Sequence, residues 1–276
     1  MKVAPTTLLN ILTRRGLNGF LGLSQETGAW VMGLFGAFGH LLLFMGRAVF
    51  HAIIPPYYAR LTVKQCLDIG YYSLPVVGMT ALFTGMVLAL QSYTGFTRFN
   101  AEGAISAVVV LSITRELAPV LAGLMVAGRV GASIAAEIAT MRVTEQIDAM
   151  QTLSVNPFHY LVAPRIIAGT LMLPILVLIA DIIGVYGGYV VAIHVLDFNV
   201  GSYLYQTWDV LEPMDVISGL VKAAAFGFIV TLMGCYHGYY SGRGAQGVGA
   251  ATTYAVVSAS ILILIVNYFL TQVFFS

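Results

Sequence analysis

Five long apolar runs limit the folds that are open to this chain. Each run has about the 20 residues that a helix needs to cross roughly 30 Å of hydrocarbon. The chain is 59% hydrophobic and only 9% charged, so it has too few polar groups to cover a water-soluble globule. The sequence therefore predicts an all-α polytopic membrane protein with five transmembrane helices, over Ile69–Ser92, Ile105–Val130, Ile166–Leu196, Val216–Tyr236 and Thr253–Phe275.

The apolar stretch over residues 29–54 differs from these five runs. It is interrupted by His40, Arg47 and His51 and ends at two prolines. Charged and polar residues at this spacing favour a helix that lies in the membrane interface, or re-enters it, over a sixth span. We expect a single domain over residues 1–276, with an N-terminal segment (1–60) that carries this helix and a transmembrane core (61–276).

The basic residues predict the orientation of the five spans. Cytoplasmic loops carry an excess of Lys and Arg. The loop over residues 197–215 has four acids and no Lys or Arg, and the same side of the membrane otherwise offers only Arg98. The N-terminus is therefore expected in the cytoplasm and the C-terminus in the periplasm. The ten residues on the cytoplasmic side are Lys2, Arg14, Arg15, Arg47, Arg60, Lys64, Arg129, Arg142, Arg165 and Arg243.

A long polar stretch, Gly128–Pro157, separates the second and third runs. At helical spacing it has an apolar face and a mostly charged face. The apolar face holds Val143, Ile147 and Met150, and the charged face holds Glu137, Met141, Glu145 and Asp148. A residue before proline disfavours helix, so the helix should end near Asn156. We expect a cytoplasmic amphipathic helix over about residues 137–157; a solvated loop helix without a partner is the alternative.

Arg115 and Glu116 lie about ten residues into the second run, near the middle of the bilayer, where ionisable groups are costly. Neighbours on a helix point about 100° apart, so the two do not simply neutralise each other. Pro119 lacks the amide that would bond the Arg115 carbonyl, which leaves this carbonyl free. Charges beside a weakened helix are typical of a substrate site. The alternative is a structural ion pair with another helix.

Two further charges of opposite sign lie in the predicted spans. Asp181 is in the third, and Lys222 is near the outer end of the fourth, where its long side chain is expected to extend towards the interface. The spacing leaves a contact between them open.

Motifs for other functions are missing or incomplete. Gly242, Gly244 and Gly247 spell G-x-G-x-x-G, but they follow a span and not a strand, and Val248 and Gly249 replace the Lys and Ser or Thr of a phosphate-binding loop. We therefore expect no ATP site in this chain. No metal-ligand spacing and no nucleophile motif is present, so we predict neither a catalytic nor a metal site. A net charge of +1 without a basic stripe gives no support for nucleic-acid binding.

One extended motif and four shorter ones carry a family resemblance. The extended motif runs E-I-A-T-M-R-V-T-E-Q-I-D-A-M from Glu137 and reaches V-N-P at Pro157. The shorter ones are R-E-L-A-P (115–119), A-G-R-V-G-A-S (127–133), the run from Leu173 through Asp181 to Gly188, and G-V-G-A-A-T-T (247–253). Over roughly residues 60–276 the chain resembles the MlaE-type permeases, the membrane subunits of MCE-system ABC transporters that move lipids. It departs from them at Ala250 and Tyr254, where relatives often carry a basic residue.

The resemblance implies roles for two sets of residues. In the family, residues matching Arg115 and Glu116, beside Pro119, line a lipid cavity, and L-A-L-Q-S-Y, which includes Gln91 and Tyr93, resembles the stretch that lines its outer part. For Tyr93, an interfacial aromatic belt is the competing interpretation. The polar helix would couple to an ATPase through Glu137, Met141, Arg142, Glu145, Gln146, Asp148 and Met150.

The resemblance also implies partners. A homodimer is expected, because one five-span chain offers half of a two-fold cavity. A cytoplasmic ABC ATPase dimer would carry the ATP and Mg, a periplasmic MCE-domain hexamer would cover the outer face, and a STAS-domain protein would bind the ATPase. The expected substrate is phospholipid moved between the bacterial inner and outer membranes, which maintains outer-membrane lipid asymmetry.

Two other classes of protein compete with this interpretation. An ion-coupled secondary transporter would use Arg115, Glu116 and Asp181 as a relay and would work without an ATPase. A lipid-modifying enzyme would need a nucleophile or a metal cluster, and the sequence offers neither.

Overall fold

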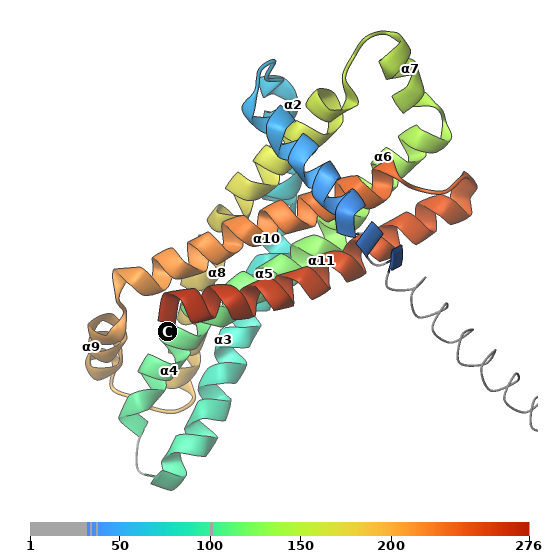
Figure 1. Ribbon diagram of the computed structural model, residues 1–276. Coiled ribbons are helices and arrows are strands. Elements are labelled where there is room, and N and C mark those ends of the chain that lie inside the picture. Colours follow the sequence, from blue (N-terminus) through green and yellow to red (C-terminus); the bar gives the residue numbers. More distant parts are fainter. Residues whose placement is uncertain (1–31, 34, 37, 100–101, 276) are drawn as a thin grey trace, which may run out of the picture. The chain divides into compact units, whose positions relative to one another are not determined.

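The computed structural model describes residues 32–33, 35–36, 38–99 and 102–275 of the chain (Figure 1). The predicted basic residues Lys2, Arg14 and Arg15 lie outside the described residues. The described part is helical and has no strand, which confirms the predicted all-α class. It divides into two units, Met1–Arg47 and Ala48–Ser276, and the spans all belong to the second.

The apolar helix near the N-terminus covers Phe38–Ile53. It is shorter than the roughly 20 residues that a spanning helix needs, and it is not among the helices long enough to cross a membrane. The expectation that it is not a sixth span agrees with this length. Its location in the membrane interface stays a prediction.

All five predicted spans are confirmed as long apolar helices within the described residues. The first, Ala59–Phe96, is made of α2 (Ala59–Ile69), η1 (Tyr71–Ser73) and α3 (Leu74–Phe96). The third, Phe158–His194, is made of η6 (Phe158–Val162) and α8 (Ala163–His194). The fourth is α10 (Pro213–Tyr239) and the fifth is α11 (Gly244–Phe275).

The second span, Ile105–Val143, is 39 residues long. At about 1.5 Å per residue it measures about 60 Å, roughly twice the hydrocarbon thickness, so part of it extends beyond the membrane. Two turns of π-helix interrupt its α-helical geometry, and such turns are frequent at functional sites. Its pieces are α4 (Ile105–Ser112), η4 (Ile113–Leu117), α5 (Ala118–Val126), η5 (Ala127–Gly131) and α6 (Ala132–Val143).

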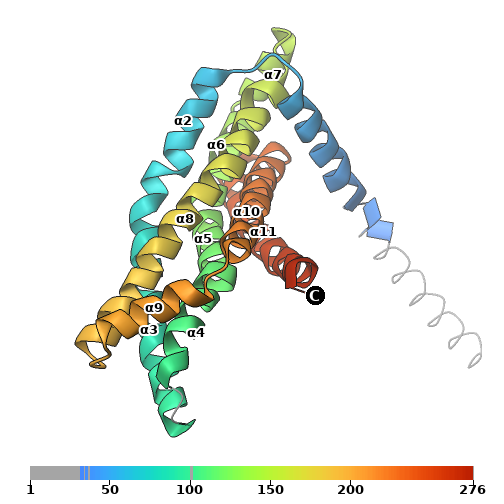
Figure 2. The ribbon, with the colours of Figure 1, turned by 90° about the vertical axis from the view of Figure 1, so that its left-hand side faces the viewer.

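Helix α10 packs against α8, α11 and α6, and α3 packs against α8 (Figures 1 and 2). Small residues allow these close approaches, since lipid provides no hydrophobic force that drives helices together. A Cβ atom added to Gly85 of α3 would overlap the backbone of Gly184 in α8, and one added to Gly227 of α10 would overlap the backbone of Gly169. The packing of α8 against both neighbours therefore depends on glycine at these positions.

The segment between the second and third spans differs from the single helix predicted for residues 137–157. Helix α6 carries the second span on to Val143, and a new short helix, α7 (Gln146–Thr152), follows. Glu145 between them has φ 59°, the left-handed conformation that ends a right-handed helix. Glu137 and Met141 thus belong to the end of the span, and Asp148 and Met150 belong to α7.

Helix α9 (Val200–Val210) lies between the third and fourth spans, where the sequence predicted only an acidic loop. The Asn199 side chain caps it by accepting hydrogen bonds from the backbone N–H groups of Gly201 (2.9 Å) and Ser202 (3.2 Å). It packs against α4 (Figure 2). A capping box between Glu212 and Asp215 then starts α10.

Candidate functional site

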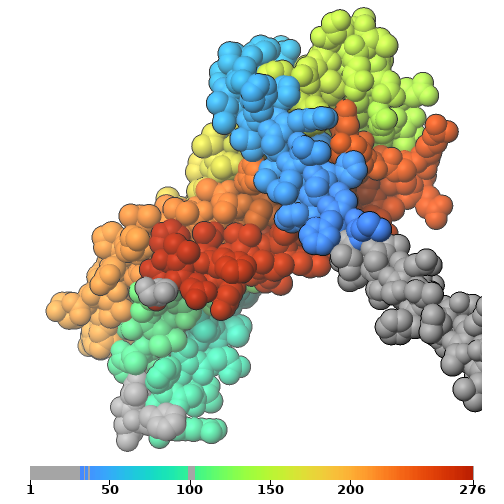
Figure 3. All heavy atoms as spheres, in the orientation of Figure 1, coloured from blue at the N-terminus to red at the C-terminus, as the bar shows by residue number. Residues whose placement is uncertain are grey.

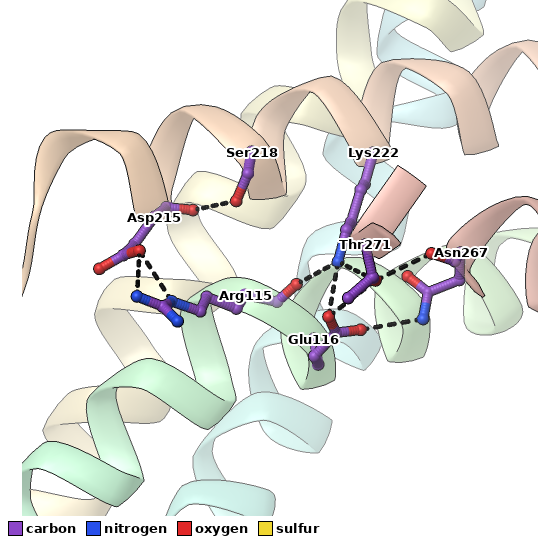
Figure 4. A network of polar contacts seen from close by, with 7 residues as sticks. All are labelled: Arg115, Glu116, Asp215, Ser218, Lys222, Asn267 and Thr271. Atoms are coloured by element: carbon purple, nitrogen blue, oxygen red, sulfur yellow. Dashed lines mark hydrogen bonds and ion pairs between the residues drawn. The ribbon is translucent and has the colours of Figure 1, made fainter. Parts of the chain in front are cut away.

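Charged and polar side chains from three spans meet around the first π turn, η4 (Figure 4). Arg115 and Glu116 come from η4, Asp215 and Lys222 from α10, and Asn267 and Thr271 from α11. We call these six residues the charged cluster. The expectation that Arg115 and Glu116 do not pair with each other agrees with the structure, because each pairs with a different residue of α10.

Glu116 is held by α10 and α11 together. Its Oε1 accepts from Lys222 Nζ at 2.7 Å and from the Thr271 hydroxyl at 2.9 Å, and its Oε2 accepts from Asn267 Nδ2 at 2.9 Å. These three donors fix both oxygens of the carboxylate. Charge-assisted hydrogen bonds of this kind are the strong ones in proteins.

Arg115 turns to the start of α10. Its Nε and Nη2 both lie 2.7 Å from Asp215 Oδ1, and its guanidinium lies 4.4 Å from the centroid of the Phe275 ring, a cation–π contact. Asp215 is only 1% exposed. The positive charge of Arg115 therefore compensates the negative charge of this buried carboxylate.

Lys222 is completely buried, so the expectation that its side chain extends to the interface is wrong. Its ammonium donates to Glu116, to the Thr271 hydroxyl (2.7 Å) and to the Arg115 carbonyl (2.8 Å). The last bond reaches the carbonyl that Pro119 leaves without its α-helical donor. A buried ammonium needs acceptors for its N–H groups, and here a weakened helix provides one of them. Lys222 does not pair with Asp181, whose carboxylate oxygens have no hydrogen-bond partner.

The other two residues expected to line the lipid cavity lie at the end of α3. Gln91 is exposed there. Tyr93 is half-buried and packs edge-on against Phe198, with ring centroids 5.9 Å apart. Among the interactions of the described residues, none joins either side chain to the charged cluster.

The residues expected to couple to an ATPase form two ion pairs and one exposed corner. Glu137 pairs with Arg165 at 2.7 Å, which links α6 to α8, and Arg142 pairs with Asp148 at 2.6 Å, which links α6 to α7. Glu145 and Gln146 are exposed at the break between the two helices. Met141 and Met150 are half-buried, and Ile147, on the predicted apolar face, is fully buried.

Four residues of the cluster were not predicted as site residues, although the sequence holds a signal for them. Asp215 and Lys222 are seven residues apart and so share one face of the otherwise apolar α10, and Asn267 and Thr271 share one face of α11 at a spacing of four. Polar side chains repeated along one face of a spanning helix mark a buried polar contact. Within the described residues, no group of three or more His, Cys, Asp or Glu side chains could hold a metal ion.

Comparison with known proteins adds independent evidence. Residues 62–273 match the family described as Permease MlaE. A probable ABC transporter permease protein of Rickettsia felis is 65% identical over 237 residues, which are 86% of this chain and 92% of that protein. The intermembrane phospholipid transport system permease protein MlaE of Haemophilus influenzae is 36% identical over 220 residues, 78% of this chain and 83% of that protein.

A third relative, from Synechocystis, is also named a probable ABC transporter permease protein and is 39% identical over 254 residues, 92% of this chain and 95% of that protein. The family match covers all five spans apart from residues 59–61 of the first and 274–275 of the fifth, and it includes all six residues of the charged cluster. A multi-pass membrane protein with this match over most of its length belongs to the MlaE permease family.

Proposed function

We propose that this chain is the membrane permease subunit of an ABC transporter that moves phospholipids between the inner and outer membranes of a bacterium, and so maintains outer-membrane lipid asymmetry. The observation that supports it most is the partial exposure of the charged cluster. The side chains of Arg115 and Glu116 are 34% and 37% exposed, whereas their partners Asp215 and Lys222 are 1% and 0% exposed.

Exposed charges within a span require polar surroundings. Insertion scales give about 2.5 to 3.5 kcal/mol for a charged residue at the centre of a spanning helix, and this is an upper bound here, because Asp215 and Thr271 of the cluster lie close to the ends of α10 and α11. An arginine that faced lipid tails would carry this cost, whereas one that faces a phosphate or a wetted cavity would not. The exposed parts of Arg115 and Glu116 are therefore proposed to line a phospholipid cavity, to which Pro119 contributes through the weakened helix.

A second copy of the chain would close this cavity. Helix α11 supplies Asn267 and Thr271 to the cluster, and its outer side forms a continuous strip on one face of the molecule (Figure 3). The strip is strongly apolar, with exposed Ile261, Leu264, Ile265, Tyr268, Phe269 and Val273. A two-fold homodimer built on this side would place two clusters around one cavity. Gln91 and Tyr93 are proposed to line its outer part.

Energy would come from a separate ABC ATPase dimer that binds ATP and Mg. The exposed corner at Glu145 and Gln146, with Asp148 beside it, is the proposed docking surface, and the two ion pairs of this region would transmit its movement to α6 and α8. A periplasmic MCE-domain hexamer and a STAS-domain protein complete the proposed complex. The name of the Haemophilus relative, a permease of an intermembrane phospholipid transport system, supports this assignment.

The proposed orientation in the bacterial inner membrane places the N-terminus in the cytoplasm and the C-terminus in the periplasm. It predicts that Ser202→Cys in α9 reacts with a membrane-impermeant thiol reagent added to the periplasm, and that Thr152→Cys in α7 does not. Both positions are exposed, and the parent would carry Cys66→Ser, since Cys235 is buried. Reversed labelling would rule out this orientation.

One experiment separates the two proposed surfaces. The complex is purified from native membranes, and the bound phospholipid and the ATPase are quantified. The double variant Glu116→Gln with Lys222→Met removes both charges of a pair, which leaves no buried charge uncompensated; it should lose phospholipid and keep the ATPase. Glu145→Lys should keep phospholipid and lose the ATPase. Full phospholipid occupancy in the folded double variant would overturn the cavity, and transport that persists without any ATPase would favour an ion-coupled transporter.

A further inference from the structure

A second cavity lies away from the charged cluster, between α4, η4, α8, α9 and the start of α10. It has a volume of about 360 Å³ and is open on one side. This is at the lower end of the roughly 300 to 1,000 Å³ of small-molecule sites. Its wall is almost entirely apolar and includes Val110, Leu178, Tyr186, Trp208 and Val216. An open apolar cavity of this size fits an alkyl chain whose remainder extends into the bilayer.

One acidic side chain, Asp181 of α8, lies in this apolar wall. It is 5% exposed, and neither carboxylate oxygen has a hydrogen-bond partner. By contrast, each of the four carboxylate oxygens of Glu116 and Asp215 accepts a hydrogen bond, either within the charged cluster or from the backbone at the start of α10. A buried carboxylate without a donor is costly, so Asp181 is the group in this cavity that most needs a partner.

The surrounding residues do not supply one. No Lys, Arg or His lines the cavity. The hydroxyls of Thr114 and Thr207, which do line it, donate to the carbonyls of Val110 (2.9 Å) and Tyr203 (2.8 Å) in their own helices. Tyr186, Tyr189 and Trp208 also line the cavity and carry O–H or N–H donors, but none of them donates to Asp181, whose oxygens have no partner. A bound molecule can therefore supply the donor that Asp181 lacks.

We propose that this cavity binds an amphiphile with an apolar chain and a polar end that carries an N–H or O–H donor, and that Asp181 accepts the hydrogen bond. The two Asp181 oxygens are buried at the cavity wall, so binding requires the carboxylate to turn towards the bound donor. A primary ammonium satisfies the site best, because it provides both a donor and a compensating charge. The site is independent of the proposed phospholipid cavity and of the ATPase, since it lies on the α8 and α9 side of η4.

Trp208 in the cavity wall gives a direct readout. The chain has two tryptophans, so Trp30→Phe leaves Trp208 alone. The full-length protein is reconstituted into two sets of phosphatidylcholine vesicles. One set contains phosphatidylethanolamine with brominated acyl chains, and the other contains the same mole fraction of phosphatidylcholine with brominated acyl chains. Phosphatidylethanolamine has N–H donors and phosphatidylcholine has none. We expect the brominated phosphatidylethanolamine to quench Trp208 at least about threefold more strongly, because a charged hydrogen bond favours it. Equal quenching by both lipids would overturn the proposal.

Variants and competitors test the role of Asp181. Asp181→Leu should abolish the preference for phosphatidylethanolamine, whereas Asp209→Asn, an exposed acid on α9 outside the cavity, should preserve it. If Asp181→Leu does not fold, Leu178→Phe narrows the cavity with Asp181 intact and should reduce the preference.

Dodecylamine should relieve the quenching, and dodecyltrimethylammonium, which has no N–H donor, should not. Equal relief by both amphiphiles, or a preference that survives Asp181→Leu, would overturn the assignment.

Discussion

Two carboxylates within the spans, Glu116 and Asp181, have opposite surroundings. Glu116 accepts three hydrogen bonds, one of them from a buried ammonium. Asp181 accepts none within the described residues and faces an apolar cavity. The same chemical group therefore has all its hydrogen-bond donors within the protein at Glu116 and lacks any donor at Asp181. The difference teaches that an acid within a span has to be interpreted from its neighbours and not from its depth alone.

The largest effect is expected from Glu116→Gln alone. This change leaves the fully buried Lys222 without its counter-ion. Breaking a buried pair by removing one partner costs about 3 to 5 kcal/mol. Thermal unfolding of the detergent-solubilised protein should show a large fall in stability. Adding Lys222→Met should restore most of it, and an unchanged melting temperature of the single variant would contradict the pairing.

Asp181→Leu is expected to have a smaller effect of opposite sign. In lipid-free detergent it replaces an unsatisfied acceptor by a side chain that suits the apolar wall. An unsatisfied buried polar group costs about 1 to 3 kcal/mol, so the melting temperature should rise. Addition of phosphatidylethanolamine should reduce the difference between the two proteins by stabilising only the parent. A fall in stability comparable to that of Glu116→Gln would mean that Asp181 has a partner after all.

The smallest effect is expected from Asp148→Asn, which removes the ion pair with Arg142 at the end of α6. The side chains of this pair are 38% and 55% exposed. Exposed pairs contribute about 0 to 1 kcal/mol, so the melting temperature should hardly change. The variant separates the effect of pairing from that of burial. A loss as large as that of Glu116→Gln would show that burial is not what distinguishes the charged cluster.

Much of the fold follows from local properties of the sequence. The five spans were predictable because each apolar run is long enough to cross a membrane by itself. Arg115 and Glu116 stand out because charge is rare in such runs, and Pro119 indicates the weakened helix beside them. These signals all lie within a few residues of the features that they predict.

The partners of those charges could not be predicted in the same way. Lys222 lies 106 residues from Glu116, and Asn267 lies 151 residues away, so only the packing of α10 and α11 brings them together. The helix break at Glu145 was missed for another reason. A left-handed conformation is unusual for glutamate, and no glycine or proline between Val143 and Gln146 marks the break.

The two π turns of the second span have a consequence for how its ends are aligned. A π turn holds one residue more than an α turn, which shifts the angular phase of everything after it. At 3.6 residues per turn, one residue corresponds to a rotation of about 100°. Loss of one residue from η5 would turn α6 through this angle about its own axis and swing Glu137 away from Arg165. The two turns thus determine which side of α6 faces α8. This effect is separate from the side-chain contacts of the charged cluster at η4.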